Sequence, residues 1–326
     1  MSKDITTLVD SDLAQKFKEA ENRTGNIQAF IEDFLQQFVS EQTKKAYIGD
    51  LKVFFDFLKR GGVSVSHPAQ IKGHHFQIYR DELLEKGYSS STINRKLVAI
   101  RSFMKWSLAS KLIDFNPLDI VKLPKVQTES PTLAFDDQEV LAMINAPDLS
   151  TKKGQMHKLV IFMLFSLGLR RSELVNIRVG DFYQDRGHYV LKIRGKGNKD
   201  RHLPLQTEVL QAIKIYTDAM AQFGVDFESE DYLIQSSIKG KNTRPMDGST
   251  VYRIIERYAK KCGISKKVGA HSCRATAISH LLDTQKTPIR DVAIFAGHSN
   301  ITTTERYDKR RENLDNSAAY KINYDD

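Results

Sequence analysis

The sequence predicts a mainly α-helical protein of two domains: a bundle of four helices, then a larger helical domain with a small antiparallel β-sheet. Four segments between residues 26 and 111 repeat apolar residues at helical spacing. The prolines between residues 117 and 131 interrupt this pattern, and the chain becomes polar there. Farther on, two short segments flank a glycine-rich turn, which is typical of a β-hairpin.

The composition indicates a globular, basic protein. The chain has 326 residues, of which 40% are hydrophobic and 27% are charged, which is sufficient for two domains with cores of their own. Lysine and arginine number 49 against 40 aspartates and glutamates, a formal net charge of +9. This excess favours a polyanionic partner such as DNA, because each neutralised phosphate releases counterions. It does not exclude a basic enzyme without a nucleic-acid partner.

The cysteines and the apolar runs bear on the compartment. Cys262 and Cys273 are too few for a disulfide framework and are not spaced as metal ligands. The first 20 residues are polar and lack the apolar core of a signal peptide. The most apolar run, residues 159–169, is too short to cross a bilayer and predicts a buried helix. We therefore expect a cytoplasmic protein without membrane contact.

The first domain is expected at residues 26–122, after a polar tail at residues 1–25. Its first helix has an apolar face made by Ile27, Phe30, Ile31, Phe34, Leu35 and Phe38. The second and third helices occupy about residues 40–60 and 74–86, and each is followed by glycine. The fourth helix occupies about residues 89–111. Its predicted inner face consists of Ile93, Leu97, Ile100, Met104 and Leu108.

The fourth helix carries several cations and no acid outside its apolar face. Such a helix is suited to lie against DNA, although the pattern suits a solvated face equally well. The candidate DNA contacts of the first domain are Thr43, Lys44, Arg95, Lys96, Arg101 and Lys105. Those of the second domain are Lys239, Lys241 and Arg244, for which a solvated face is again the alternative.

A linker is expected at residues 123–132, followed by a second domain at residues 133–326 that includes a C-terminal tail. Within this domain, residues 188–194 and 201–205 flank the turn at residues 195–200 as a hairpin. The first strand is predicted to be half-buried because two sets of residues alternate in it. These sets are Val190, Lys192 and Arg194, and Tyr189, Leu191 and Ile193.

Three segments of the second domain carry residues suited to cutting a phosphodiester without hydrolysis. That chemistry needs a nucleophile, cations that hold the non-bridging oxygens, and an acid for the leaving oxygen. Arginine suits the cationic role because its planar fork binds two phosphate oxygens at once. The segments are residues 168–174, the turn that contains Lys196, and residues 271–307.

Four strings in these segments resemble a known family. GLRRSEL, RGKGNKDRHLPL, HSCRATAISHLL and GHSNITTTERY occur in this order, and Tyr307 follows His298 by nine positions. Together they resemble the tyrosine recombinases, or phage-type integrases, over about residues 26–310. The resemblance implies a two-domain DNA clamp, in which a SAM-like core-binding domain precedes an α-rich catalytic domain with a small sheet.

The resemblance assigns the reacting roles to four residues. Arg170 and Arg274 resemble the two arginines that clamp the phosphate. His298 resembles a histidine that bonds a phosphate oxygen. Tyr307 resembles the nucleophile, which forms a 3′-phosphotyrosyl link with the DNA.

Three further residues have assisting roles by resemblance. Lys196 resembles the lysine that protonates the leaving 5′ oxygen, and His271 the histidine that assists proton transfer at the nucleophile. Glu173 resembles a supporting acid that orients the site. Arg171 leaves a register ambiguity beside Arg170, and the string Gly-Leu-Arg favours Arg170.

By resemblance, the enzyme needs no metal and no ATP, and it acts as a homotetramer on double-stranded DNA core sites through a Holliday junction. Accessory DNA-bending or recombination proteins are further candidate partners. The C-terminal tail either docks on a neighbouring protomer or forms a local helix or frayed end. Two other classes stay open: a type IB topoisomerase, and a DNA-binding accessory factor without catalysis. The sequence does not separate integration or excision of a mobile element from resolution of DNA dimers.

Overall fold

The computed structural model describes residues 26–122, 133–195, 200–235 and 244–308. The chain divides into two compact units between residues 128 and 129. We call the described residues before this division the first unit and those after it the second unit. The expected polar tail and linker, residues 1–25 and 123–132, lie outside the described residues.

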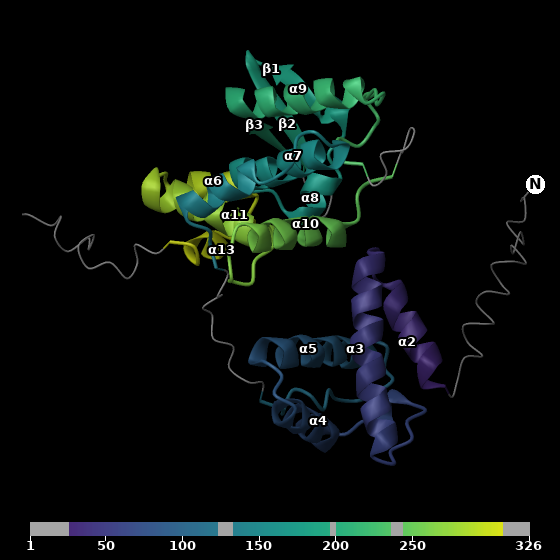
Figure 1. Cartoon of the computed structure of the whole chain (residues 1–326). Helices are drawn as coiled ribbons and strands as arrows, with labels where there is room; N and C mark the ends of the chain where they lie inside the picture. Colours follow the sequence, from purple (N-terminus) through teal and green to yellow (C-terminus); the bar gives the residue numbers. More distant parts are fainter. Residues whose placement is uncertain (1–25, 123–132, 196–199, 236–243, 309–326) are drawn as a thin grey trace, which may run out of the picture. The chain divides into compact units, whose positions relative to one another are not determined.

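The first unit consists of helices, as predicted (Figure 1). They are α2 (Ile27–Gln36), α3 (Glu41–Arg60), α4 (Gly73–Glu85) and α5 (Ser90–Ala109), with a short 3-10 helix η1 (Pro68–Gln70). Side chains of Asn26, Ser40 and Ser89 accept a hydrogen bond from the first turn of α2, α3 and α5. These N-caps satisfy backbone groups that would otherwise lack a partner, and so they fix where each helix begins.

Aromatic rings fill the core of the first unit. Phe34, Phe54, Phe76 and Phe103 are all completely buried and pack mainly edge to face or stacked. The predicted burial of Leu108 is wrong, because this residue is 39% exposed. Ser107 lies on the inner face of α5 in its place. The next buried residue after Met104 is three positions along the helix, not four.

The second unit is mainly helical and includes a small sheet. Its helices are α6 (Asp137–Asn145), α7 (Lys152–Leu167), α8 (Arg171–Val175), α9 (Thr207–Gln222), α10 (Gly248–Lys261), α11 (Ala270–Ser279), α12 (Ile289–Ala296) and α13 (Thr302–Glu305). A 3-10 helix η2 (Val179–Asp181) precedes the sheet, and a π-helix η3 (His280–Thr284) follows α11.

The sheet has three antiparallel strands in the order β1-β2-β3. The predicted hairpin is present as β2 (His188–Arg194) and β3 (Asp200–Pro204), while β1 (Phe182–Asp185) had not been predicted. The predicted alternation of buried and exposed residues along β2 is wrong. The adjacent Val190 and Leu191 are both buried, and Tyr189 is 49% exposed. Neighbouring strand residues point to opposite faces, so the middle strand is covered on both faces at this point.

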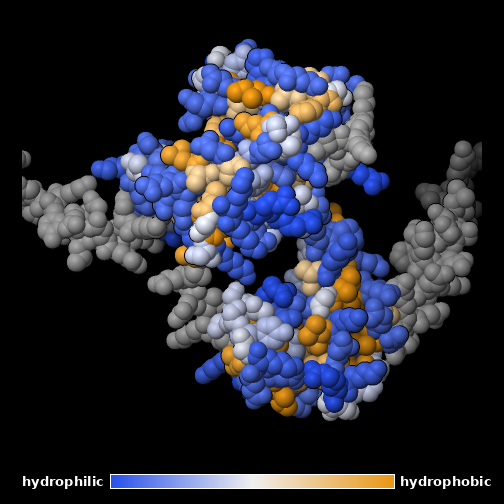
Figure 2. Space-filling model, viewed as in Figure 1, coloured by the Kyte–Doolittle hydropathy of each residue, from blue (hydrophilic) through white to orange (hydrophobic). Residues whose placement is uncertain are grey.

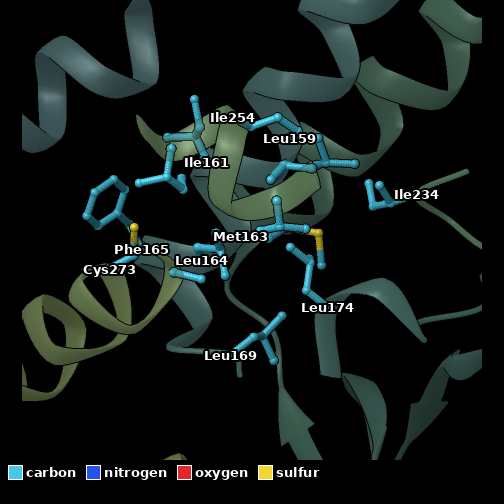
Figure 3. Packing of buried hydrophobic residues seen from close by; sticks show 14 of the residues in the cluster. Leu159, Ile161, Met163, Leu164, Phe165, Leu169, Leu174, Ile234, Ile254 and Cys273 are labelled. Atoms are coloured by element: carbon cyan, nitrogen blue, oxygen red, sulfur yellow. The ribbon is translucent and has the colours of Figure 1, made fainter. Parts of the chain in front are cut away.

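Helix α7 lies at the centre of the second unit. Its side chains are buried on several sides, and Figure 3 shows Leu159, Met163 and Leu164 among residues from other elements, including Ile254 of α10 and Cys273 of α11. The apolar run predicted as a buried helix is therefore a core helix. On the face shown in Figure 2, both units are mainly hydrophilic. Within the described ranges, no helix is long and apolar enough to cross a membrane.

Candidate active site

Arg170 lies where α7 ends and α8 begins. Gly168 ends α7 in the left-handed conformation, with φ of 54°, and this turns the chain so that Arg170 becomes the N-cap of α8. The Arg170 guanidinium donates to Glu173 Oε1 at 2.7 Å and to the backbone carbonyl of Gly297 at 2.8 Å. The Arg171 side chain instead lies against Gly248, where an added Cβ would be 2.8 Å from its Nε.

Glu173 is a buried carboxylate that joins two arginines. Its side chain is 4% exposed and receives a bidentate pair of hydrogen bonds from Arg201 of β3, at 2.8 and 3.0 Å. Burial alone would raise the pKa of Glu173, but the hydrogen bonds and charge of Arg201, together with Arg170, lower it to about 2. Sequence reasoning missed Arg201, although it lies within the string RGKGNKDRHLPL.

Arg274 is held by the carboxyl ends of two helices. It is 2% exposed, donates to the carbonyl of Gly168 at 2.6 Å, and also donates to the carbonyl of Ala296. These carbonyls end α7 and α12, where the helix dipole is negative, so the site attracts a cation. Burial, and then the charge of Arg170, lowers the pKa of Arg274 to about 10, which leaves it charged at neutral pH.

His298 connects Arg274 to α13. Arg274 Nη2 lies 2.8 Å from His298 Nε2, and His298 Nδ1 lies 2.8 Å from the Thr304 hydroxyl. Burial, and then the charge of Arg274, lowers the pKa of His298 to about 4. The imidazole is therefore neutral at pH 7.

Tyr307 follows α13, and its hydroxyl lies 3.3 Å from His271 Nε2. Its ring stacks against that of His298 with centroids 6.2 Å apart, and it packs on the small apolar cluster of Ile278, Leu282, Val292 and Ala296. Burial raises the pKa of Tyr307, against the opposing charges of Arg274 and Arg170. Burial also lowers the pKa of His271, which leaves this ring able to accept a proton.

The structure thus brings together six residues that the sequence had singled out, namely Arg170, Glu173, Arg274, His271, His298 and Tyr307. Lys196 lies outside the described residues, so its predicted place in the site stays a prediction. Cys273 is completely buried, and burial raises the pKa of its thiol, so it is not a nucleophile here. In the described parts of the chain, no group of three His, Cys, Asp or Glu side chains could hold a metal ion.

The candidate DNA contacts of α5 fall into different environments. Lys96 is 9% exposed, and its ammonium lies 3.4 Å from the buried Asp50, which Arg95 also contacts. Arg101 donates to the carbonyl of Leu118 at 3.3 Å. Lys105 is exposed. This placement gives Lys96 a structural ion pair, whereas Lys105 is accessible to DNA.

The remaining candidates are near helix ends or outside the described residues. On α3, Lys44 pairs with Glu41 at 2.8 Å, and the backbone N–H of Thr43 donates to the Ser40 cap. Arg244 is exposed. Lys239 and Lys241 lie outside the described residues. Contact of these residues with DNA stays a prediction.

The fold and the site define a class of protein. Two fixed arginines, two histidines in ring contact with a tyrosine, and the hydroxyl of that tyrosine beside one of these histidines form a site suited to phosphoryl transfer to a protein nucleophile. Family comparisons agree with this class. The phage integrase family matches residues 134–313, and the SAM-like N-terminal domain of phage integrases matches residues 27–111.

Individual relatives match most of the chain. A tyrosine recombinase of Pseudothermotoga lettingae is 31% identical over 82% of this chain and 87% of its own length. The tyrosine recombinase XerC of Anoxybacillus flavithermus is 29% identical over 88% of this chain and 93% of its own length. A lambda integrase tetramer solved on a Holliday junction shares the fold, with a TM-score of 0.65 and 14% identity over 91% of this chain and 81% of that chain.

The chain therefore belongs to the phage integrase family of tyrosine recombinases. It is a site-specific recombinase, an enzyme that cuts and rejoins DNA.

Proposed function

We propose that Tyr307 is the nucleophile and that Arg170 and Arg274 bind the scissile phosphate. The observation that carries this proposal is the 3.3 Å contact between the Tyr307 hydroxyl and His271 Nε2, beside two arginines already held in place. A tyrosine with a raised pKa needs both a proton acceptor and a clamped phosphate before it can attack. His271 would be the proton acceptor, and Arg170 and Arg274 would hold the phosphate.

In the cleavage step, one bond to phosphorus forms as another breaks. The Tyr307 oxygen forms a bond to phosphorus as its proton passes to His271, and the bond from phosphorus to the 5′ oxygen breaks. Lys196 protonates the leaving oxygen, by resemblance to the family. The product is a 3′-phosphotyrosyl link and a free 5′ hydroxyl. A 5′ hydroxyl from the partner strand reverses these steps, so the bond energy is kept and neither ATP nor a metal is required.

The guanidinium groups supply the electrostatic part of the mechanism. Charge grows on the non-bridging oxygens as Tyr307 attacks, and fixed donors aimed at that position stabilise it without reorganising. Glu173 holds Arg170 in this arrangement, and the helix-end carbonyls hold Arg274. Each arginine keeps some N–H groups for the phosphate, because a guanidinium carries five of them.

The DNA substrate is proposed to be a pair of short core sites bound by a homotetramer that passes through a Holliday junction. The lambda integrase tetramer on such a junction supports this, as does the match of both family domains. Accessory DNA-bending proteins are further proposed partners. We place the reaction in the cytoplasm, since the chain's cysteines are Cys262 and Cys273 and both are free thiols.

The test is a suicide-substrate assay in EDTA with nicked duplexes taken from the flanks of the gene. The wild-type protein is expected to form a protein–DNA adduct that survives denaturant. Tyr307→Phe removes the nucleophilic oxygen and keeps the ring, so it is expected to bind the same duplex and form no adduct. An adduct that persists in Tyr307→Phe would show that another residue attacks.

Tyr252→Phe is the matched control, because Tyr252 lies against Gly269 at the start of α11 and is outside the set of reacting residues. It is expected to keep the adduct. Relaxation of supercoiled plasmid without a core site would favour a topoisomerase over a recombinase. Tight DNA binding with no adduct from any flank, by wild type as well, would mean that the core site or an accessory protein is missing from the assay.

A further inference from the structure

Thr304 is a buried residue beside the site that the mechanism above does not use. It lies on α13, three positions before Tyr307, and is 0% exposed. Its hydroxyl lies 2.8 Å from His298 Nδ1. A hydroxyl can donate or accept a hydrogen bond, so this contact does not by itself fix which ring nitrogen carries the proton.

The contact at Nε2, on the other side of the His298 ring, fixes the position of the proton. Arginine has only donors, so the Arg274 guanidinium donates to His298 Nε2, which must be unprotonated. A neutral imidazole carries a single proton, which is therefore on Nδ1 and donates to Thr304. In this state His298 has no N–H at Nε2 to offer to a phosphate oxygen, and it occupies one N–H of Arg274.

Phosphate binding therefore requires a change at His298. To donate from Nε2, the ring must carry its proton there, and Nδ1 must then accept a hydrogen bond. The Thr304 hydroxyl is the group that can follow this change, because it accepts from Nδ1–H in one tautomer and donates to bare Nδ1 in the other. A side chain without a hydroxyl would leave a buried ring nitrogen without a partner in both tautomers.

We propose that Thr304 is a positioning residue that lets His298 change tautomer when the scissile phosphate binds. One proton leaves Nδ1 for water and one reaches Nε2 from water, so the charge of the ring is unchanged. His298 then donates to a phosphate oxygen, and the Arg274 Nη2 donor is released to the same phosphate. The inference rests on the proposed function, because it assumes that Arg274 and His298 bind this phosphate.

Three variants test the inference in the adduct assay. Thr304→Val keeps the shape of the side chain without its hydroxyl, and Thr304→Ser keeps the hydroxyl. Thr303→Val is the matched control, because Thr303 is an exposed neighbour on the same helix. At saturating DNA, Thr304→Val is expected to form adduct about 10- to 100-fold more slowly, by analogy with the loss of a group that orients a metal-bound histidine. Thr304→Ser should restore most of the rate, and Thr303→Val should match wild type.

A spectroscopic measurement separates this role from a loss of packing. The ¹⁵N shifts of His298, in protein labelled at histidine and assigned with His298→Gln, report which ring nitrogen carries the proton. In Tyr307→Phe we expect the proton on Nδ1 in the free protein and on Nε2 when uncleaved duplex is bound. The spectra use the background that cannot cleave, so they need DNA binding and not the nucleophile.

The outcomes separate the two proposals. A His298 proton that stays on Nδ1 in the DNA complex would overturn the tautomer change, whatever the nucleophile is. So would equal adduct rates for Thr304→Val and Thr303→Val while wild type is active. Should Thr304→Val fail to fold, the His298 tautomer measured in Tyr307→Phe, which keeps Thr304, and the Thr304→Ser rate still decide the question. An adduct that survives Tyr307→Phe would contradict only the proposed nucleophile.

Discussion

At the residue scale, the site depends on a single buried carboxylate. Glu173 bonds Arg170 on one side and Arg201 on the other, and its side chain is 4% exposed. A buried charge without partners is costly, so each arginine stabilises the carboxylate that positions the other. We therefore infer that Arg201 helps to hold Arg170 in position through Glu173.

Arg201→Met tests this support. The pKa of Glu173 lies at about 2 in the folded protein, below its ordinary value of 4.5. The stability that this difference contributes is therefore present above about pH 4.5 and is lost as the pH falls towards 2. Removing Arg201 is expected to lower the free energy of unfolding at pH 7 by about 3–5 kcal/mol. The loss should shrink between pH 5 and pH 2, as measured by urea unfolding.

Arg186→Met is the control for the Arg201 variant, since the Arg186 side chain is 92% exposed and its nearest acid lies 3.9 Å away. It is expected to change stability by less than about 0.5 kcal/mol. A loss in Arg201→Met that stays constant over the whole pH range would mean that the ion pair with Glu173 is not its cause.

The sequence singled out most of the side chains that the structure brings together at the site, but it missed part of their support. Arg170, Arg274, His298 and Tyr307 were found because four strings of unusual composition occur in a fixed order. Arg201 was missed because one arginine in a strand has no pattern of its own, and its partner Glu173 lies 28 positions earlier. Only the fold brings such a pair together.

At the scale of elements, two helix ends hold the arginines of the proposed phosphate clamp. Helices α7 and α12 both end at a glycine in the left-handed conformation, Gly168 and Gly297, and carbonyls at these ends accept from Arg170 and Arg274. Gly297 has an additional constraint. An added Cβ there would be 2.8 Å from Arg201 Nη1.

Gly297→Ala is expected to lose both stability and activity. A residue with a Cβ costs about 1–2 kcal/mol in the left-handed conformation. The added methyl group would also push Arg201 away from Glu173, so we expect adduct formation to fall at least about tenfold, the effect of a barrier raised by about 1.4 kcal/mol. Thermal unfolding and the suicide-substrate assay measure the two effects.

Gly224→Ala separates these causes. Gly224 also has a positive φ, of 71°, but an added Cβ there meets nothing within 4 Å. It should lose a similar amount of stability from backbone strain and keep the full adduct rate. Equal activity in the two variants would contradict a role for the close approach of Gly297 to Arg201.

The sequence predicted elements where a local signal exists. Serine caps and glycine ends marked α3, α4 and α5 to within a few residues, because capping is a local interaction. The strand β1 was missed because it has four residues, most of them exposed, and its stability comes from pairing with β2. The exposure of Leu108 likewise depends on which row of α5 meets its neighbours.

At the scale of the whole molecule, each unit has a hydrophobic core of its own. Phe54 is in the aromatic core of the first unit and Leu164 in the core around α7 of the second, and both are completely buried. Units with separate cores can unfold as separate cooperative transitions.

Calorimetry of two core variants tests this independence. Phe54→Ala is expected to destabilise the first unit by about 3–5 kcal/mol, and Leu164→Ala the second by about 2–5 kcal/mol. Each should lower the temperature of one transition and leave the other in place. A single transition that both variants shift equally would show that the units unfold together.

The backbone acceptors of the two arginines also limit which substitutions can damage the site. Three of the acceptors that hold Arg170 and Arg274 are main-chain carbonyls, at Gly168, Ala296 and Gly297. Every amino acid supplies the same carbonyl, so no substitution can delete these acceptors; it can only displace them. Selection on this part of the site therefore acts on the path of the backbone more than on side-chain chemistry. The residues expected to tolerate the least change are therefore Gly168 and Gly297, whose left-handed conformation sets that path.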